Sequence, residues 1–225
     1  MSVLVGKQIT KTYHVGDTVI EALKAIDITI EGGEYIAITG RSGAGKSTLL
    51  YQLSLLDAPS SGSILFEDRD ITDMNEREKT NLRLTAFGYV FQDYALIPEL
   101  TALENVKIPL LMRGAGGDYN ARAIELLEAV DLGDRVHNRP GQLSGGQQQR
   151  VAIARALVMQ PTVLFADEPT ANLDSETGEA IMNLFDKLHN QGQTIVMVTH
   201  EDIYAQRATR KIELSDGSIL YDGKA

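Results

Sequence analysis

The sequence contains no cysteine. The chain can therefore form neither a disulfide nor a thiolate zinc site, it has no cysteine nucleophile, and its composition fits a reducing compartment. Long apolar stretches are also missing. The longest, such as residues 194–199, have the size of a strand, whereas a membrane-spanning helix needs about 20 apolar residues. Residues 1–6 lack the basic region and long apolar stretch of a signal peptide. We expect a chain that does not cross a membrane by itself.

Positive charge is scarce as well. Lysine and arginine together number 21 against 31 aspartates and glutamates, which gives a formal net charge of −10 at pH 7. The acidic excess is spread over both halves, so neither has the basic character of a nucleic-acid-binding module. An acidic surface also disfavours direct adhesion to anionic lipid. The length of 225 residues corresponds to about 1.5 typical domains, which predicts one large domain or one domain with an inserted lobe.

Short apolar segments alternate with amphipathic ones along the chain. Strands are predicted at residues 3–13, 19–30, 34–39, 63–66, 87–91, 162–166 and 194–199. Helices are predicted near 47–56, 101–109, 120–130 and 175–190, with a terminal hairpin at 212–221. Buried strands alternating with helices indicate an α/β fold with a parallel sheet covered on both faces, interrupted by a mostly helical insertion of roughly 70 residues.

Two local signals refine the helix predicted from residue 101. Thr101 and Glu104 have the spacing of a capping box, in which each side chain bonds the main-chain N–H of the other residue. Pro109 lacks an N–H group and is expected to end or kink the helix.

A glycine-rich loop follows the predicted strand 34–39. Residues 40–47 match G-x-x-x-x-G-K-[ST] in full, between a strand and a helix as the motif requires, which disfavours a chance match. The main-chain N–H groups would face phosphate oxygens, Lys46 would neutralise the β- and γ-phosphates, and the Ser47 hydroxyl would bind Mg²⁺. The predicted nucleotide-binding residues here are Gly40, Arg41, Ser42, Gly43, Ala44, Gly45, Lys46, Ser47 and Thr48.

Two acidic residues end the predicted strand 162–166. Asp167 is placed to hold Mg²⁺ through water, and Glu168 to polarise an attacking water molecule. By themselves they would read as solvated acids at a strand end, but a phosphate loop in the same chain favours the functional interpretation. The Asn-Lys-x-Asp element that reads guanine in GTPases does not occur, so ATP is the better prediction.

Residues 143–157 carry the most specific motif, Leu-Ser-Gly-Gly-Gln followed by Gln-Arg-Val-Ala-Ile-Ala-Arg-Ala-Leu. It resembles the signature motif of ATP-binding-cassette (ABC) ATPases. Ser144, Gly145 and Gly146 would open an apolar helix and leave N–H groups at its positive end, which suits an anion. An ordinary serine N-cap beside glycines would be the preferred interpretation if this segment stood alone.

Further ABC motifs occur in family order. Gln92 matches the Q-loop glutamine, residues 172–174 match the D-loop, His200 matches the switch histidine, and Tyr13 lies where the family places an aromatic ring that stacks on adenine. Singly, each has a plain alternative: a polar strand end for Gln92, a helix N-cap for Asp174, a surface imidazole for His200 and an edge-strand aromatic for Tyr13. Their shared order and spacing favour the family roles.

The resemblance implies a P-loop NTPase fold of the ABC type. Its central sheet is mostly parallel, with an antiparallel β subdomain and a helical subdomain that bears the signature motif. The whole chain, 1–225, would be a single ABC ATPase domain, with a core and β subdomain at 1–91 and 160–225 and the helical subdomain at about 92–159.

The resemblance also implies a site shared between two chains. In a head-to-tail homodimer, Ser144, Gly145, Gly146 and Gln147 of one copy close over the ATP held by the other, and Asp174 links the two sites. Glu168 orients water, His200 holds the γ-phosphate and that water, and Gln92 senses Mg²⁺ and the γ-phosphate. The implied Mg²⁺ ligands are Ser47, Gln92 and Asp167.

A chain of this kind usually drives a separate membrane permease and sits at the cytoplasmic face of the inner membrane through that partner. Residues 90–110 look most like those of the lipoprotein-releasing, macrolide-exporting and antimicrobial-peptide-exporting group, although polar amino-acid importers share much of this stretch. A cell-division-type cassette that moves no substrate is the nearest alternative. DNA-repair ABC ATPases need long coiled-coil heptads, which the sequence lacks, and a small-molecule kinase would leave the signature motif unexplained.

Overall fold

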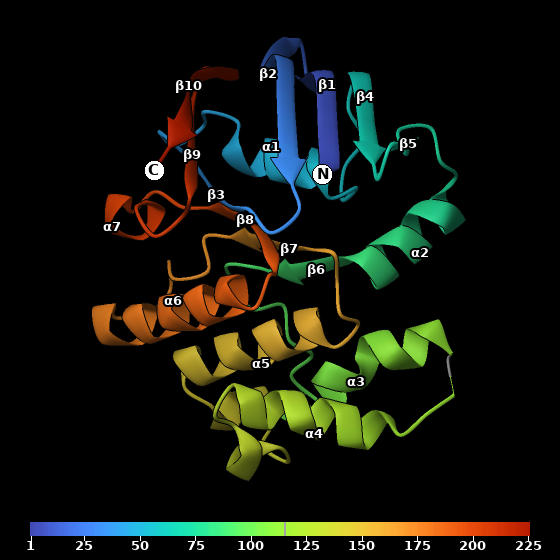
Figure 1. Ribbon diagram of the computed structural model, residues 1–225, viewed down its shortest axis with the longest axis vertical. Coiled ribbons are helices and arrows are strands. Elements are labelled where there is room, and N and C mark those ends of the chain that lie inside the picture. The colour runs from blue at the N-terminus through green and yellow to red at the C-terminus, as the bar shows by residue number, and fades with distance from the viewer. Residues whose placement is uncertain (115) are drawn as a thin grey trace. The chain divides into compact units, whose positions relative to one another are not determined.

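Residues 1–80 and 192–225 form one unit of the computed structural model, and residues 81–191 form a second unit (Figure 1). The structure describes residues 1–114 and 116–225. The predicted helical subdomain, about 92–159, has residue numbers that fall within the range of the second unit. Ala115 of the predicted subdomain lies outside the described residues.

An antiparallel sheet in the first unit has the strand order β2-β1-β4-β5. It consists of β1 (Ser2–Val15), β2 (Thr18–Glu31), β4 (Ser61–Phe66) and β5 (Arg69–Asp70), and β1, β2 and β4 stand side by side in Figure 1. The pairing of β1 with β2 steps from Lys11–Leu23 to Thr12–Glu21. Ala22 is thus an extra residue on β2, a β-bulge that bends the strand.

A second set of strands in this unit has the order β10-β9-β3-β8: β10 (Ser218–Lys224), β9 (Arg210–Ser215), β3 (Tyr35–Gly40) and β8 (Thr194–Val198). β3 runs parallel to β8 and β9, and β10 runs antiparallel to β9. β8 is buried at every residue, as a continuous apolar run in a parallel sheet should be. The predicted turn at Asp216-Gly217 is confirmed, and both residues have positive φ, 47° and 79°.

Two helices accompany these strands, α1 (Lys46–Leu53) and α7 (Asp202–Ala205). α1 packs against β3 and β8 and also against β1 and β2, with Leu49 and Leu53 fully buried. The helix ends three residues before the predicted residue 56. The Ser54 hydroxyl donates to the Leu50 carbonyl at 2.7 Å, and Leu55 takes a left-handed φ of 60°, which no α-helix accommodates.

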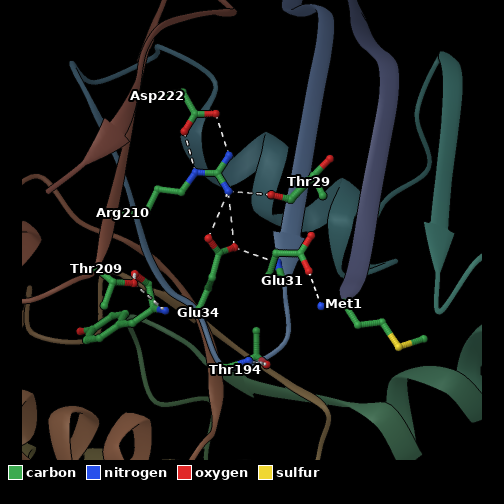
Figure 2. A network of polar contacts seen from close by, with 10 residues as sticks. Met1, Thr29, Glu31, Glu34, Thr194, Thr209, Arg210 and Asp222 are labelled. Carbon is green, nitrogen blue, oxygen red and sulfur yellow. Dashed lines mark hydrogen bonds and ion pairs between the residues drawn. The ribbon is translucent and has the colours of Figure 1, made fainter.

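Arg210 at the start of β9 connects four segments of the first unit (Figure 2). Its guanidinium makes a bidentate pair with Asp222 of β10, at 2.6 and 2.7 Å, and donates to the Thr29 carbonyl of β2 at 2.7 Å. The same guanidinium lies 3.4 Å from the Glu34 carboxylate, which accepts the Glu31 N–H at 2.7 Å. The network joins the end of β2 to β9 and β10, and its hydrogen bond to Asp222 raises the pKa of Arg210.

The second unit contains the parallel pair β6 (Phe87–Val90) and β7 (Val163–Asp167). Its helices are α3 (Ala102–Arg113), α4 (Tyr119–Ala129), α5 (Gly145–Leu157) and α6 (Ser175–Asn190), with single 3₁₀ turns at Gly133–Arg135 and Pro140–Gln142. α3 packs on α4 and α5, and α5 also packs on β6 and α6. The buried side chains between these helices include Val106, Leu127, Val151, Ile153 and Phe185.

The capping box at the start of α3 is confirmed. The Thr101 hydroxyl accepts the Glu104 N–H at 3.2 Å, and the Glu104 carboxylate accepts the Thr101 N–H at 2.8 Å. Of the two outcomes expected at Pro109, an end or a kink, the first is wrong, because α3 continues to Arg113 and its C-cap is Gly114, whose φ is 66°. The buried residues of α3, Ala102, Asn105 and Val106, all precede Pro109, so burial anchors the first part of the helix.

Two helices were not predicted. α2 (Glu76–Ala86) buries only Ala86, so its sequence lacks the apolar period from which a helix is predicted. α7 has only four residues, which is too short to show such a period. Among the described residues, no helix combines the length and the apolar character needed to cross a membrane.

Candidate nucleotide site

The predicted phosphate loop connects β3 to α1 in the first unit. α1 begins at Lys46, whose side chain is 7% exposed, and the Lys46 ammonium donates to the Gly40 carbonyl at 3.0 Å and to the Arg41 carbonyl at 3.1 Å. In the part of the chain that the structure describes, no carboxylate pairs with Lys46. A buried cation that contacts only carbonyl dipoles, at the positive end of a helix, suits a multiply charged anion.

Gly45 in this loop cannot carry a side chain. Its φ is 99°, and a Cβ atom built on it would lie 2.4 Å from the Ala22 carbonyl oxygen. Ala22 is the extra residue of the β2 bulge, so the bulge brings the main chain of β2 against the phosphate loop. Only glycine combines this positive φ with so close an approach.

His200 directly follows Thr199 at the end of β8. β3 and β8 are parallel with Ile38 in register with Val198, and the Thr199 N–H donates to the Ile38 carbonyl at 3.1 Å. Gly40 and His200 therefore each stand two residues beyond this register pair, at the same edge of the sheet. The first unit thus brings the phosphate loop and the predicted switch histidine to one edge, where ligands of α/β sheets bind.

Tyr13, the predicted adenine-stacking residue, lies on β1 and is 37% exposed. Its hydroxyl donates to Asp57 at 3.1 Å, and the Lys11 ammonium contacts both Asp57 oxygens, at 2.7 and 2.8 Å. Burial raises the pKa of Asp57, but its hydrogen bond with Lys11, the Ala58 N–H, the charge of Lys11 and the Tyr13 hydroxyl outweigh burial, so the pKa is lowered. Neither Lys11 nor Asp57 was predicted as a site residue.

Asp167 ends β7 in the second unit, and Gln92 and Glu168 lie just after β6 and β7. Val90 of β6 is in register with Ala166 of β7, so Gln92 and Glu168 each lie two residues beyond this pair. Asp167, the last residue of β7, is 8% exposed. Glu168 has φ of 48°, a left-handed conformation that costs a non-glycine residue about 1–2 kcal/mol. Its carbonyl accepts the Ala171 N–H at 3.2 Å, which holds the tight turn after β7.

The segment that begins at Gln92 is bound to a loop and to a helix of the second unit. The Asn172 side chain donates to the Gln92 carbonyl at 2.9 Å. From α5, the Arg155 guanidinium donates to the carbonyls of Tyr94, at 2.8 Å, and Ala95. Burial lowers the pKa of Arg155, while the charge of Asp93 acts in the opposite direction. Asn172 and Arg155 belong to motifs recognised in the sequence, yet these contacts were not predicted because nothing in the spacing shows them.

The signature segment opens α5 as predicted. The Ser144 hydroxyl accepts the Gln147 N–H at 3.3 Å, and the Gln147 side chain accepts the Ser144 N–H at 2.9 Å, so Ser144 is the N-cap in a full capping box. A Cβ atom on Gly146 would lie 2.1 Å from the Thr177 methyl group, and one on Gly145 would lie 2.9 Å from the Tyr94 hydroxyl. The two glycines therefore let α5 approach α6 and the Q-loop segment closely.

Asp174 is the N-cap of α6. Its carboxylate accepts the Thr177 N–H at 2.9 Å and the Thr177 hydroxyl at 2.7 Å, and the main-chain bond is the main cause of its lowered pKa. Its role between two copies of the chain stays a prediction.

The predicted Mg²⁺ ligands are divided between the units. Ser47 belongs to the first, and Gln92 and Asp167 belong to the second. A hydroxyl, an amide and a carboxylate are hard oxygen donors of the kind that Mg²⁺ prefers, so the residues fit the ion.

The chain has the features of a P-loop nucleotide-binding cassette. These are a phosphate loop after a buried strand, acidic residues at the end of β7, and a helix that begins with two glycines. The sequence model of the family described as "ABC transporter" matches residues 23–171. The chain belongs to this family, as an ATP-binding cassette with the ABC ATPase fold, and it is an ATPase of the ABC class.

Curated relatives agree with this assignment. An uncharacterized ABC transporter ATP-binding protein of Thermotoga maritima is 49% identical over 210 residues, which are 93% of this chain and 90% of that protein. A macrolide export ATP-binding/permease protein, MacB, of Brucella melitensis is 48% identical over 217 residues, 96% of this chain. The match spans only 34% of the length of that MacB protein.

Solved structures confirm the fold predicted from the sequence. The dimeric ATP-binding cassette MJ0796 in a post-hydrolysis state, bound to ADP and phosphate, superposes with a TM-score of 0.91 at 44% identity, covering 98% of each chain. The cbiO1 cassette of Clostridium perfringens, part of the cbiONQ transporter complex, has a TM-score of 0.87 at 32% identity, covering 99% of this chain and 88% of that one.

Proposed function

We propose that this chain binds and hydrolyses ATP to power a separate membrane permease of the exporter or lipoprotein-releasing type. The observation that carries the proposal is that one cassette holds two groups suited to binding an anion. Lys46, a buried cation that pairs with no carboxylate among the described residues, lies at the phosphate loop, and the Ser144-capped N-terminus of α5 lies in the signature segment.

ATP is proposed to lie on the phosphate loop, Gly40–Thr48, with Lys46 against its β- and γ-phosphates and Tyr13 against the adenine. Glu168 takes a proton from the attacking water and His200 holds the γ-phosphate. Ser47, Gln92 and Asp167 are the proposed Mg²⁺ ligands, and the bound ion would neutralise phosphate charge. Gln92 passes the state of the nucleotide to the permease.

A second copy of the chain is the proposed partner in catalysis. One cassette offers a phosphate loop and a signature segment, and in a twofold dimer each signature segment, Ser144–Gln147, closes over the nucleotide of the other copy while Asp174 links the sites. The similarity to MJ0796, solved as a dimer with ADP and phosphate, supports this arrangement. A twofold contact is also the commonest symmetry of homo-oligomers.

The permease is proposed from the relatives. MacB is named as both an ATP-binding and a permease protein, and this chain resembles a third of its length; cbiO1 is part of a transporter complex. We propose that the chain lies at the cytoplasmic face of the inner membrane through its permease, acts as a single cassette with a helical subdomain near residues 92–159, and does not bind nucleic acid.

The variant Glu168→Gln tests the proposed chemistry. The amide cannot accept a proton from water, so ATP hydrolysis is expected to fall by about 100-fold or more while ATP binding persists. Gel filtration with ATP should then show a stable dimer. Glu99→Gln, an equal change of charge at an exposed position of the same unit, should hydrolyse ATP normally. A Glu168→Gln protein that turns over ATP at the normal rate contradicts the proposal.

The permease is tested by co-purification from membranes and identification of the bound partner. A permease with four spans and a large outer domain supports the exporter or lipoprotein-releasing group. A multi-span importer permease overturns that choice and leaves the ATPase assignment intact.

A further inference from the structure

Tyr13 is fixed from two directions by side chains that the family assignment does not involve. Lys11 and Tyr13 are two residues apart on β1, so their side chains leave the same face of the strand. The Lys11 ammonium lies over the Tyr13 ring, 5.1 Å from its centroid, within the range of a cation–π interaction. Asp57 accepts the Tyr13 hydroxyl at 3.1 Å and binds the same ammonium.

Asp57 is in turn attached to the end of α1. The main-chain N–H groups of Leu56 and Asp57 both donate to the Tyr51 carbonyl in the last turn of that helix, at 2.9 and 3.1 Å. The Lys11 ammonium completes the link by donating to the Ala58 carbonyl at 2.7 Å, and its side chain is only 13% exposed. The helix that begins at the phosphate loop therefore ends at the group that holds Tyr13.

Tyr13 is partly exposed, 37%, although Lys11 lies over its ring. An aromatic ring has two faces, and the Lys11 ammonium occupies one of them. A planar base can then stack on the other face, and the hydrogen bond to Asp57 restricts rotation of the ring. Ordering the ring before the nucleotide arrives removes part of the entropy cost of binding.

We propose that Lys11 and Asp57 are positioning residues for Tyr13, which hold its ring so that the nucleotide base stacks on the face opposite Lys11. This inference rests on the proposed role of Tyr13 in binding adenine. It adds that a single helix, α1, sets the positions of both the phosphate loop and the base-stacking ring.

The inference is tested by measuring the binding of Mg-ATP and of Mg-tripolyphosphate, which has no base, by titration calorimetry. Lys11→Met and Asp57→Asn are each expected to weaken ATP binding by about threefold to fivefold, the size of a cation–π contact or a hydrogen bond at a partly exposed site. Binding of tripolyphosphate should not change. In a Tyr13→Ala background, neither substitution should weaken ATP binding further, because the ring they position is gone.

A control variant separates positioning from general damage. Asp222→Asn removes one partner of the bidentate pair with Arg210, in the same unit as Tyr13. It should lower stability and leave the ratio of ATP to tripolyphosphate affinity unchanged. If Lys11→Met or Asp57→Asn does not fold, Tyr13→Phe still tests the contact with Asp57, since it keeps the ring and removes only the hydroxyl that donates to Asp57.

The measurements distinguish a failure of this inference from a failure of the proposed adenine-binding role on which it rests. Unchanged ATP binding by Tyr13→Ala would show that the adenine role of Tyr13 is wrong. Weak binding by Tyr13→Ala with full ATP affinity in Lys11→Met, Asp57→Asn and Tyr13→Phe overturns the positioning role alone. Equal losses for ATP and tripolyphosphate in Lys11→Met and Asp57→Asn also overturn it, because a positioned ring contacts only the base.

Discussion

The side-chain amide of Asn172 donates a hydrogen bond to the main-chain carbonyl of Gln92 over 2.9 Å. The bond joins the loop after β7 to the segment after β6, and both loops belong to the second unit. Arg155 of α5 donates to two further carbonyls of the same segment, those of Tyr94 and Ala95. Three motifs that are far apart in the sequence are thus connected through main-chain carbonyls, whose positions depend on loop conformation.

Changing Asn172 to aspartate should weaken this connection. The carboxylate cannot donate and would face the Gln92 carbonyl, so we expect the free energy of unfolding to fall by about 1 kcal/mol and ATP hydrolysis to slow. Urea unfolding and a phosphate-release assay measure the two effects. Asn81→Asp makes the same change at an exposed position of α2 and should alter neither quantity. Normal hydrolysis by Asn172→Asp would show that this bond has no part in the reaction.

The capping boxes of α3 and α5 offer a matched pair of variants. Ser144→Ala and Thr101→Ala each remove an N-cap hydroxyl in the second unit and should each cost about 1 kcal/mol of stability. Only Ser144→Ala should also reduce hydrolysis, because the signature segment is proposed to bind the partner's nucleotide. Equal hydrolysis by the two variants would limit Ser144 to a capping role.

Gly146→Ala tests the close packing of α5 on α6. The added methyl group would meet the Thr177 methyl at 2.1 Å, so we expect a loss of about 1–3 kcal/mol of stability. Gly141→Ala is the control, since a Cβ atom there has no neighbour within 4 Å. The double variant Gly146→Ala/Thr177→Ser removes the opposing methyl and keeps the hydroxyl that Asp174 accepts. It should recover most of the loss, and a double variant as unstable as Gly146→Ala would refute this packing argument.

The contribution of Asp57 to stability should depend on pH. Its pKa in the folded protein lies below the ordinary value of 3.8, so its interactions are fully present well above pH 3.8 and are lost as pH falls through the lowered pKa. Asp57→Asn should cost about 1 kcal/mol at pH 7, allowing for solvent screening of a side chain that is 33% exposed. Urea unfolding at pH 7 and pH 3 should show the difference shrinking in acid. A difference that grows in acid would contradict the assigned direction.

The strands and helices that could be predicted are those with a strong apolar pattern. The runs at 34–39 and 194–199 became β3 and β8 because continuous apolar segments are stable only when both faces are buried. α2 escaped prediction since it has almost no buried face, and α3 continues past Pro109 to Arg113 although Leu111 and Met112 are exposed.

In the candidate site, too, some residues could be predicted from the sequence and others could not. Gln92, Glu168 and His200 could be predicted because each stands in a family motif, one or two positions after an apolar strand. Lys11 and Asp57 could not, since 46 residues separate them and only the folded β1 and the end of α1 bring them together. Contacts that depend on side-chain geometry between distant segments leave no periodic trace in a sequence.

Glu168 holds its carboxylate on a left-handed backbone, which glycine or asparagine would adopt at lower cost. At this position the backbone conformation favours glycine or asparagine, whereas the proposed reaction requires a carboxylate. Selection of variants for thermal stability alone would therefore favour replacement of Glu168, the proposed base. Thermostable versions of this cassette should accordingly be selected under an assay of turnover, because their melting temperature gives no warning that the reaction has been lost.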